Sequence, residues 1–356
     1  MTQPILIKNG RIWDGERFFY GDVLTEGDKI CRMEPEITCE KAFVYDAAGK
    51  IVSAGLIDPH IHARGLSGPE YAISPEAATF PFGVTAAADA GSRLGDRQVV
   101  EQFAVKMCIF VDSKIENNHL NEEITAQRLS QYGDKAIGIK MFFDDTSKNV
   151  LDITPLQEVC AIARSRNLKV LVHCNHSPTP MLDIVKTLAP GDILTHVFHG
   201  GKHTCLEEDF AAFRLAREKG VTLDAGFAGY VHTDFGVLHA AFSAGFFPDT
   251  ISTDITCNSA YRRGGRYGLT MAMSMARTAG MEETEIFRAV TTSAAASLGM
   301  GGQWGALKPG ETADIAVLEY GDEGFDLTDK AGNHIASREG YRCLLTVCNG
   351  QIVYRN

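Results

Sequence analysis

Eight short apolar runs, separated by segments long enough for helices, recur through the middle of the chain. The runs are residues 55–62, 84–90, 106–111, 136–141, 169–173, 192–196, 221–224 and 250–254. Most are apolar on both faces, as strands buried in a parallel sheet should be. Eight such alternations over roughly 250 residues match the size of a TIM barrel. A doubly wound open sheet is the competing arrangement, but the Gly-rich turn that usually follows its first strand is missing. We therefore predict an α/β fold with a (β/α)8 barrel.

The two ends of the chain carry similar strand and turn signals. Asn-Gly, a strong hairpin-turn dipeptide, occurs as Asn9-Gly10 and again as Asn349-Gly350, each time beside residues typical of strands. We therefore predict one small β-sandwich domain assembled from both ends. The predicted boundaries are residues 1–54 and 303–356 for this domain and residues 55–302 for the barrel.

The charge and cysteine pattern disfavours several classes of protein. The net charge is −11 and no Lys/Arg-rich run occurs, which argues against a nucleic-acid partner. No apolar run approaches the roughly 20 residues that span a bilayer. No secretory signal is visible after Met1, so we expect no membrane association and a cytoplasmic location. The nine cysteines lack any C-x-x-C pair, and we expect all of them to be reduced and buried as small apolar residues.

Two histidines end the first apolar run, in the sequence Asp58-Pro59-His60-Ile61-His62. Residues two apart on a strand point to the same side, so His60 and His62 should converge on one point. Two imidazoles held in this way suit a divalent metal such as zinc. The alternative is an ordinary pair of polar residues on a loop.

Other polar residues lie at or near the ends of four further runs. These residues are Lys140, His173, His196 and Asp254. A barrel places its catalytic side chains at the C-terminal ends of its strands. Because five strand ends then agree on one face, we predict that these residues and the two histidines form a metal cluster.

Lys140 requires a separate explanation, because a charged ammonium inside a barrel is costly unless it is paired. Burial lowers the pKa of a lysine and favours the neutral, nucleophilic amine. Such an amine can add CO₂ to become an anionic carbamate that bridges two metals. A salt bridge to Asp144 or Asp145 is the alternative, and the residues by themselves do not decide between the two.

Together, these positions resemble the binuclear amidohydrolase superfamily, and the resemblance covers essentially the whole chain. It rests on the Asp-x-His-x-His pattern, the strand-four lysine, the single histidines after strands five and six, and the aspartate after strand eight. More narrowly, segments 83–85, 89–92, 194–200 and 251–254 resemble a branch labelled dihydroorotase-like, whose members include deacetylases.

The resemblance implies two divalent metal ions, with zinc expected, that share a hydroxide and a CO₂-derived carbamate on Lys140. It implies that His60 and His62 hold one metal together with Asp254, and that His173 and His196 hold the other. The hydroxide would attack the substrate, and Asp254, as the catalytic residue, would take its proton.

Three residues are candidates for binding substrate. Arg64 stands two residues after His62 and could bind a substrate carboxylate, as the arginine at this spacing does in dihydroorotases; the alternative is a rim salt bridge with Glu70. Asn175 and His176 replace the Gly-Glu that we expect in the branch. A second departure is Phe227, in a segment where His-Gly-Gly is common.

Two further histidines, His199 and His203, follow His196 closely in the chain. We expect them to face solvent or substrate, and we leave them out of the metal set.

The predicted activity is hydrolysis of an amide or ester (acyl or acetyl) bond in a small carboxylate-bearing substrate by a metal-dependent enzyme that forms a homo-oligomer. A cyclic-amide hydrolase of the dihydroorotase or hydantoinase type is the main alternative. A deaminase fits less well because it needs no strand-four lysine. A non-catalytic assembly protein also fits poorly, because all six candidate ligand positions are filled.

Overall fold

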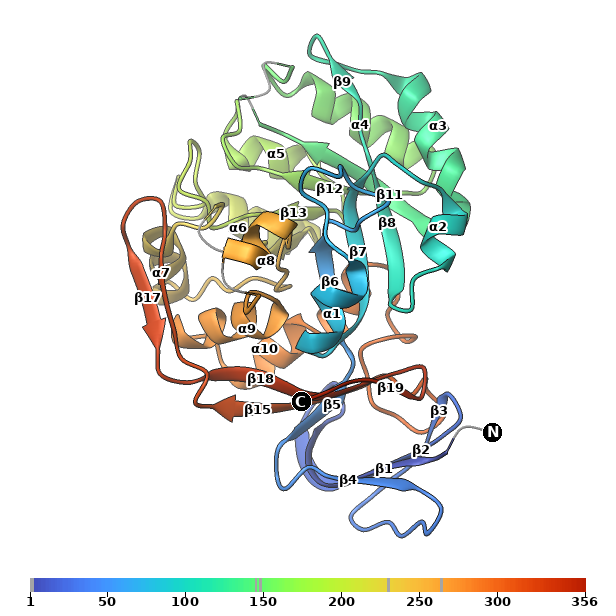
Figure 1. Ribbon diagram of the computed structural model, residues 1–356. Coiled ribbons are helices and arrows are strands. Elements are labelled where there is room, and N and C mark those ends of the chain that lie inside the picture. Colours follow the sequence, from blue (N-terminus) through green and yellow to red (C-terminus); the bar gives the residue numbers. More distant parts are fainter. Residues whose placement is uncertain (1–2, 145, 147–148, 229–230, 263–264) are drawn as a thin grey trace.

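The computed structural model describes the chain except for residues 1–2, 145, 147–148, 229–230 and 263–264. It has two main sheets. A curled parallel sheet is surrounded by helices, and a second, mixed sheet below it contains strands from both ends of the chain (Figure 1).

The parallel sheet has seven strands in sequential order, with every neighbouring pair parallel. The strands are β6 (Leu56–Ile61), β7 (Val84–Ser92), β8 (Lys106–Asp112), β11 (Ala136–Phe142), β12 (Lys169–His173), β13 (Ile193–Thr195) and β14 (Thr222–Asp224). All nine residues of β7 are buried, as expected for a strand that is covered on both faces. Seven of the eight predicted runs therefore form strands.

The eighth run, residues 250–254, is not assigned as a strand, so this part of the prediction is wrong. The segment is nevertheless bonded to both edge strands of the sheet. Its Thr250 and Ser252 carbonyls accept hydrogen bonds from the residues after β14, at 3.0 and 3.1 Å, and the Asp254 N–H donates to the His60 carbonyl at 2.8 Å. Asp254 has a φ of 47°, and this left-handed conformation is incompatible with a regular ladder.

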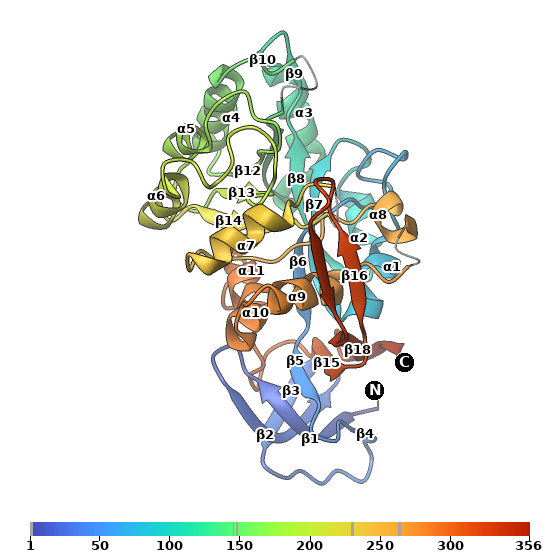
Figure 2. The same cartoon turned by 90° about the vertical axis from the view of Figure 1, so that its left-hand side faces the viewer.

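Eleven α-helices are assigned in the described part of the chain, and those that follow the parallel strands lie on the outside of the curled sheet (Figures 1 and 2). They are α1 (Pro75–Thr79), α2 (Arg97–Glu101), α3 (Glu122–Tyr132), α4 (Thr154–Ser165), α5 (Met181–Thr187), α6 (Ala211–Lys219), α7 (Phe235–Ser243), α8 (Cys257–Arg262), α9 (Leu269–Thr278), α10 (Glu283–Ala289) and α11 (Thr292–Ser297). Asp234 caps α7 by accepting hydrogen bonds from the N–H groups of Gly236 and Val237.

The second sheet combines both ends of the chain, because β5 pairs with β15. Its eight strands are β1 (Ile5–Trp13), β2 (Phe18–Glu26), β3 (Lys29–Glu34), β4 (Phe43–Asp46), β5 (Ile51–Ala54), β15 (Ile315–Gly321), β18 (Gly340–Cys348) and β19 (Gln351–Arg355). Ile7, Val52, Val317 and Leu345 belong to one buried cluster on this sheet. Strands from the two ends of the chain thus share one eight-stranded sheet.

Only one of the two Asn-Gly pairs forms a hairpin turn. Asn349 and Gly350 connect β18 to β19 with φ angles of 50° and 73°, as a type I′ turn requires. The prediction for Asn9-Gly10 is wrong, because β1 continues through both residues. The ladder between β1 and β2 shifts register there, and a Cβ on Gly10 would lie 2.5 Å from the Val52 side chain. Gly10 therefore allows a bulge and a close approach rather than a turn.

A hairpin that the sequence did not reveal links β15 to β18. Its strands are β16 (Phe325–Thr328) and β17 (His334–Ser337). Figure 2 shows it rising from the second sheet alongside the helical layer.

All nine cysteines are free. Cys31 is exposed and Cys39 and Cys257 are only partly buried, so the expectation that all nine are buried is wrong for these three residues. No helix in the described part of the chain is long and apolar enough to cross a membrane.

Candidate metal centre

The first candidate ligand group is His60, His62 and Asp254. The two histidines come from the end of β6, and Asp254 ends the extended segment beside it. The Asp254 Oδ1 lies 3.3 Å from the His60 Nε2 and 2.9 Å from the His62 Nε2. All three residues are buried.

The second candidate group is His173, His196 and His232. Their ring centroids lie 4.5–4.9 Å apart. The other Asp254 oxygen, Oδ2, lies 3.8 Å from the His196 Nε2 and 3.7 Å from the His232 Nε2. Asp254 therefore directs one carboxylate oxygen toward the two histidines of its own group and the other oxygen toward the second group.

Lys140 in β11 is fully buried beside the first group. Its Nζ lies 3.3 Å from the His60 Nε2. Asp144, one of the two acids considered as an ion-pair partner, instead lies 3.8 Å from the His173 Nε2, and Asp145 is outside the described residues. Burial lowers the pKa of Lys140 to about 8, although Asp254 and Asp224 oppose this shift. The neutral amine of Lys140 is therefore more populated near neutral pH than that of an exposed lysine.

Hydrogen bonds at Nδ1 orient the histidines of the first group. The His62 Nδ1 lies 3.1 Å from the Ser67 hydroxyl, which donates to Asp89 at 3.1–3.2 Å. Because that hydroxyl proton is already used, the His62 Nδ1 must be the donor to Ser67. His60 bonds to Thr195 in the same way, at 3.2 Å. Both Nε2 lone pairs are left directed at the site, which is the usual arrangement of a metal ligand and its supporting hydrogen bond.

His196 provides the most direct test of whether a metal fits. Its Nδ1 donates to the Gly226 carbonyl at 2.7 Å, so its Nε2 carries a lone pair. That Nε2 is buried and has no hydrogen-bond partner in the part of the chain that the structure describes. A buried polar atom without a partner costs about 1–3 kcal/mol. A metal ion beside His173 and His232 would satisfy it, so these residues fit a metal.

The backbone is strained at two of these residues. His196 and Asp254 have φ angles of 64° and 47°, in the left-handed region that residues other than glycine rarely adopt. Such strain costs about 1–3 kcal/mol per residue and concentrates at functional sites.

The protonation states are also appropriate for binding metal. Burial, aided by neighbouring positive groups, holds the pKa values of His60 and His196 well below the usual range. Burial alone would raise the pKa of Asp254, but the surrounding histidines outweigh it and hold that pKa well below its usual value. Neutral imidazoles and an ionised carboxylate are the forms that bind a metal.

The candidate substrate residues lie in different surroundings. Asn175 is buried, and its Nδ2 lies 2.8 Å from the His232 Nδ1, whereas His176 is exposed. Arg64 is also exposed. The expected rim partner of Arg64, Glu70, instead pairs with Arg93 at 2.7 Å.

Two histidines differ from expectation. The sequence reasoning missed His232, which belongs to the second group; its position in the loop after β14 was the available signal. His199 is completely buried rather than facing solvent, and burial lowers its pKa to about 3. It belongs to neither ligand group of the described residues.

Two cavities adjoin His232. One, of about 280 Å³, is lined by residues that include Asn175, His176 and Lys330. The other, of about 210 Å³, includes Tyr71, Asp254 and Thr256 among its lining residues. The site therefore has space for a small molecule beside His232.

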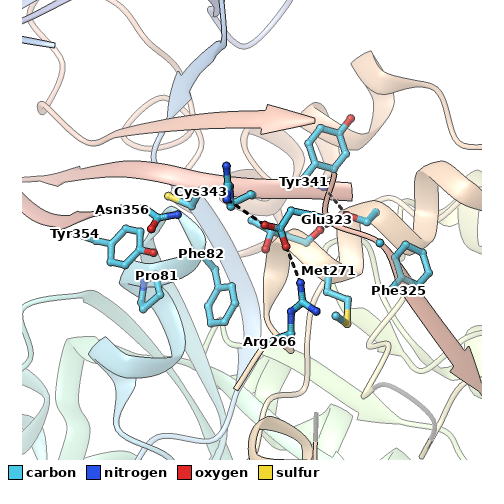
Figure 3. Close-up of a pocket in the computed structure, with 14 residues that line it drawn as sticks. Pro81, Phe82, Arg266, Met271, Glu323, Phe325, Tyr341, Cys343, Tyr354 and Asn356 are labelled. Carbon is cyan, nitrogen blue, oxygen red and sulfur yellow. Dashed lines mark hydrogen bonds and ion pairs between the residues drawn. The ribbon is translucent and has the colours of Figure 1, made fainter. Parts of the chain in front are cut away.

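A separate cavity of about 130 Å³ is lined by residues of α9, β18 and the segments near them (Figure 3). Glu323 points to Arg266 in Figure 3, at 2.9 Å, and also pairs with Arg342 at 3.3 Å. None of the described residues that line this cavity is a histidine, and its charged side chains form ion pairs, so it is not the candidate metal site.

Comparison with known proteins agrees with this geometry. The model of the amidohydrolase family matches residues 51–353. A deacetylase from Enterococcus faecalis is 27% identical over 99% of both chains, and a deacetylase from Agrobacterium fabrum is 26% identical over 81% of this chain and 75% of that protein. A crystal structure of an adenine deaminase is 27% identical with a TM-score of 0.84, covering 99% of both chains. A dihydroorotase structure has the same fold, with a TM-score of 0.85 at 22% identity, and covers 100% of this chain and 98% of that one. This chain belongs to the amidohydrolase family and is a metal-dependent hydrolase.

Proposed function

We propose that the protein hydrolyses an acyl bond, most simply an acetyl amide or ester, in a small molecule that carries a carboxylate. The observation that carries this proposal is the position of Asp254, which belongs to the first ligand group and directs its second oxygen toward a histidine of the other group, His232. The deacetylase from E. faecalis, similar over its whole length, supports acyl hydrolysis as the reaction class.

The proposed cofactors are two divalent metal ions, with zinc expected. His60, His62 and Asp254 would hold one ion, and His173 and His196 would hold the other beside His232. Lys140, converted to a carbamate, would add an anionic ligand next to His60. When bound, such metals supply a nucleophile derived from water near neutral pH and polarise the scissile carbonyl.

The chain's own groups would handle the proton and the substrate. Asp254, held ionised by the surrounding histidines, would take a proton from the attacking water and return it to the leaving group. Asn175 and His176 would contact the substrate in the cavity of about 280 Å³. Arg64 is the further sequence-derived candidate, at the rim.

We propose a complete (β/α)8 barrel as the scaffold, closed by the extended segment 250–255. Hydrogen bonds from this segment to the residues after β14 and to the end of β6 support this proposal. The sheet formed by the two chain ends would be a separate small domain, covering residues 1–54 and 303–356.

Hydrolysis of a cyclic amide is the second candidate. Dihydroorotases from Streptococcus pyogenes are 47% identical over 62 residues, or 17% of this chain. Such a match supports a shared site rather than a shared substrate.

The test is a hydrolysis screen with the protein loaded with zinc and bicarbonate. The panel contains N-acetyl amino acids, O-acetyl α-hydroxy acids, dihydroorotate and hydantoin, together with adenine because of the deaminase similarity. We expect an acetyl substrate to be turned over by the wild type and by K41A, an exposed-lysine control, but not by K140A. Turnover of dihydroorotate or adenine alone would reject the acyl reaction. Full activity in K140A would reject the role of Lys140.

A further inference from the structure

The β16–β17 hairpin connects β15 to β18 of the second sheet, yet its tip is hydrogen-bonded to the part of the molecule that contains the candidate metal site. The Asp329 carboxylate accepts a hydrogen bond from the Phe235 N–H at 2.7 Å. Asn333 donates to both Asp329 and Asp234, at 2.9 and 3.3 Å. These contacts hold the hairpin tip beside the start of α7.

Lys330 follows Asp329 at this tip and lines the cavity of about 280 Å³ together with Asn175, His176 and His232. Its side chain is exposed. Lys330 and His232, a residue of the second ligand group, thus line the same cavity.

The two acidic residues that line this cavity, Asp234 and Asp329, accept hydrogen bonds from the start of α7 and from the hairpin. Asp234 accepts from the N–H groups of Gly236 and Val237, at 2.8 and 3.0 Å. Asp329 accepts from Phe235 and Asn333. Lys330, in contrast, forms no ion pair with any described residue. Apart from histidines, it is the only basic residue among the described residues that line the two cavities beside His232.

Arg64, the arginine expected from the sequence to bind a carboxylate, lines neither cavity. A substrate whose acyl bond lies at Asp254, in one cavity beside His232, would meet the ammonium of Lys330 if its carboxylate enters the other cavity beside His232.

We propose that Lys330 is the specificity-determining residue that binds the substrate carboxylate. This inference rests on the proposed function, because it assumes a carboxylate-bearing acyl substrate. An ammonium that lines a cavity and forms no ion pair attracts an anion. When the anion is a carboxylate, the two groups also form a charge-assisted hydrogen bond.

The kinetic test uses matched substrates that differ only in this charge: N-acetylalanine with N-acetylalaninamide, and O-acetyllactate with O-acetyllactamide. We expect K330M to lower the ratio of kcat/KM for the acid to kcat/KM for the amide about tenfold, mainly through KM. K330R should recover part of this preference. The control K308M, at another exposed lysine, should keep the wild-type ratio.

Two outcomes would overturn the proposal. An unchanged ratio in K330M would show that Lys330 does not recognise the carboxylate. A lowered ratio in R64M together with an unchanged ratio in K330M would assign the carboxylate to Arg64.

A binding measurement separates failure of this inference from failure of the proposed reaction. Calorimetric titration of the zinc-loaded protein with lactate and lactamide needs no turnover. If no acyl substrate is cleaved but K330M loses lactate affinity about tenfold, the acyl reaction is rejected and the anion-binding role of Lys330 stands. If lactate fails to bind the wild type, or binds K330M equally well, the role of Lys330 is rejected.

Discussion

The Oδ1 atom of Asp254 lies 2.9 Å from the Nε2 atom of His62. The opposite carboxylate oxygen faces the histidines that follow β13 and β14. One side chain therefore touches both candidate ligand groups, and its backbone adopts a left-handed φ of 47° to reach that position. Under the proposed function, this geometry would place both metal binding and proton transfer on a single residue.

Replacing Asp254 should accordingly abolish activity. We expect D254N to lower kcat/KM for the identified substrate by about 10²–10⁴, because the amide cannot accept the proton. Steady-state kinetics and metal analysis on the same preparations check this. D326N, at an exposed hairpin position, should behave as wild type. Retention of more than a tenth of the wild-type activity by D254N would contradict the proposed role.

The hydroxyl of Ser67 should control metal affinity without touching the metal. It links the His62 Nδ1 to Asp89, so S67A frees the imidazole to rotate. Loss of such a supporting partner typically weakens metal binding about 10–100-fold. Competition with a chromophoric chelator measures the affinity, and S130A, at an exposed serine, serves as the control. Equal affinities in S67A and wild type would show that packing alone orients His62.

Removing metal should destabilise the protein. The buried His196 Nε2 has no hydrogen-bond partner among the described residues, and a bound metal would satisfy it only in the folded state. Free metal at about 100 times its Kd adds about 2.7 kcal/mol to the free energy of unfolding. Thermal melting with and without chelator should therefore show a lower Tm after chelation, and a smaller decrease in H196A. An unchanged Tm would argue against a metal at His196.

Acid should weaken the contact between β1 and α10. Burial alone would raise the pKa of Glu283, but its bonds to Arg11 and Arg277 outweigh this and lower the pKa below 4.5. A lowered carboxyl pKa stabilises the fold above the unfolded value, and this stabilisation is lost as the pH falls through the folded value. For a partly exposed network we expect on the order of 1 kcal/mol.

Urea unfolding of the metal-free protein between pH 6 and 3.5 measures this contribution. E283Q should be less stable than wild type at pH 6, and the difference should shrink as the pH falls. E282Q, at the exposed neighbouring residue, should follow the wild-type curve. A difference that stays constant with pH would show that Glu283 acts through packing rather than charge.

The sequence alone was sufficient for the parts of the site that depend on local periodicity. Two histidines spaced by two residues at the end of an apolar run must share a side of the strand, and the structure places His60 and His62 on the same Asp254 oxygen. The alternation of apolar runs and helical segments likewise predicted seven of the strands that form the parallel sheet. The periodicity of a strand or a helix is a property of consecutive residues, so it can be recognised without knowledge of distant contacts.

Only the tertiary structure decided which loop residues meet at the site. His232, a member of the second group, contacts Asn175, which lies 57 residues earlier in the chain. Lys330 reaches the cavity because Asp329 accepts a hydrogen bond from a residue 94 positions earlier. The Asn9-Gly10 prediction failed for the same reason: the packing of Gly10 against Val52 produced a bulge where the dipeptide favours a turn. The positions of loop residues depend on contacts with residues far away in the chain, and the local sequence does not identify those residues.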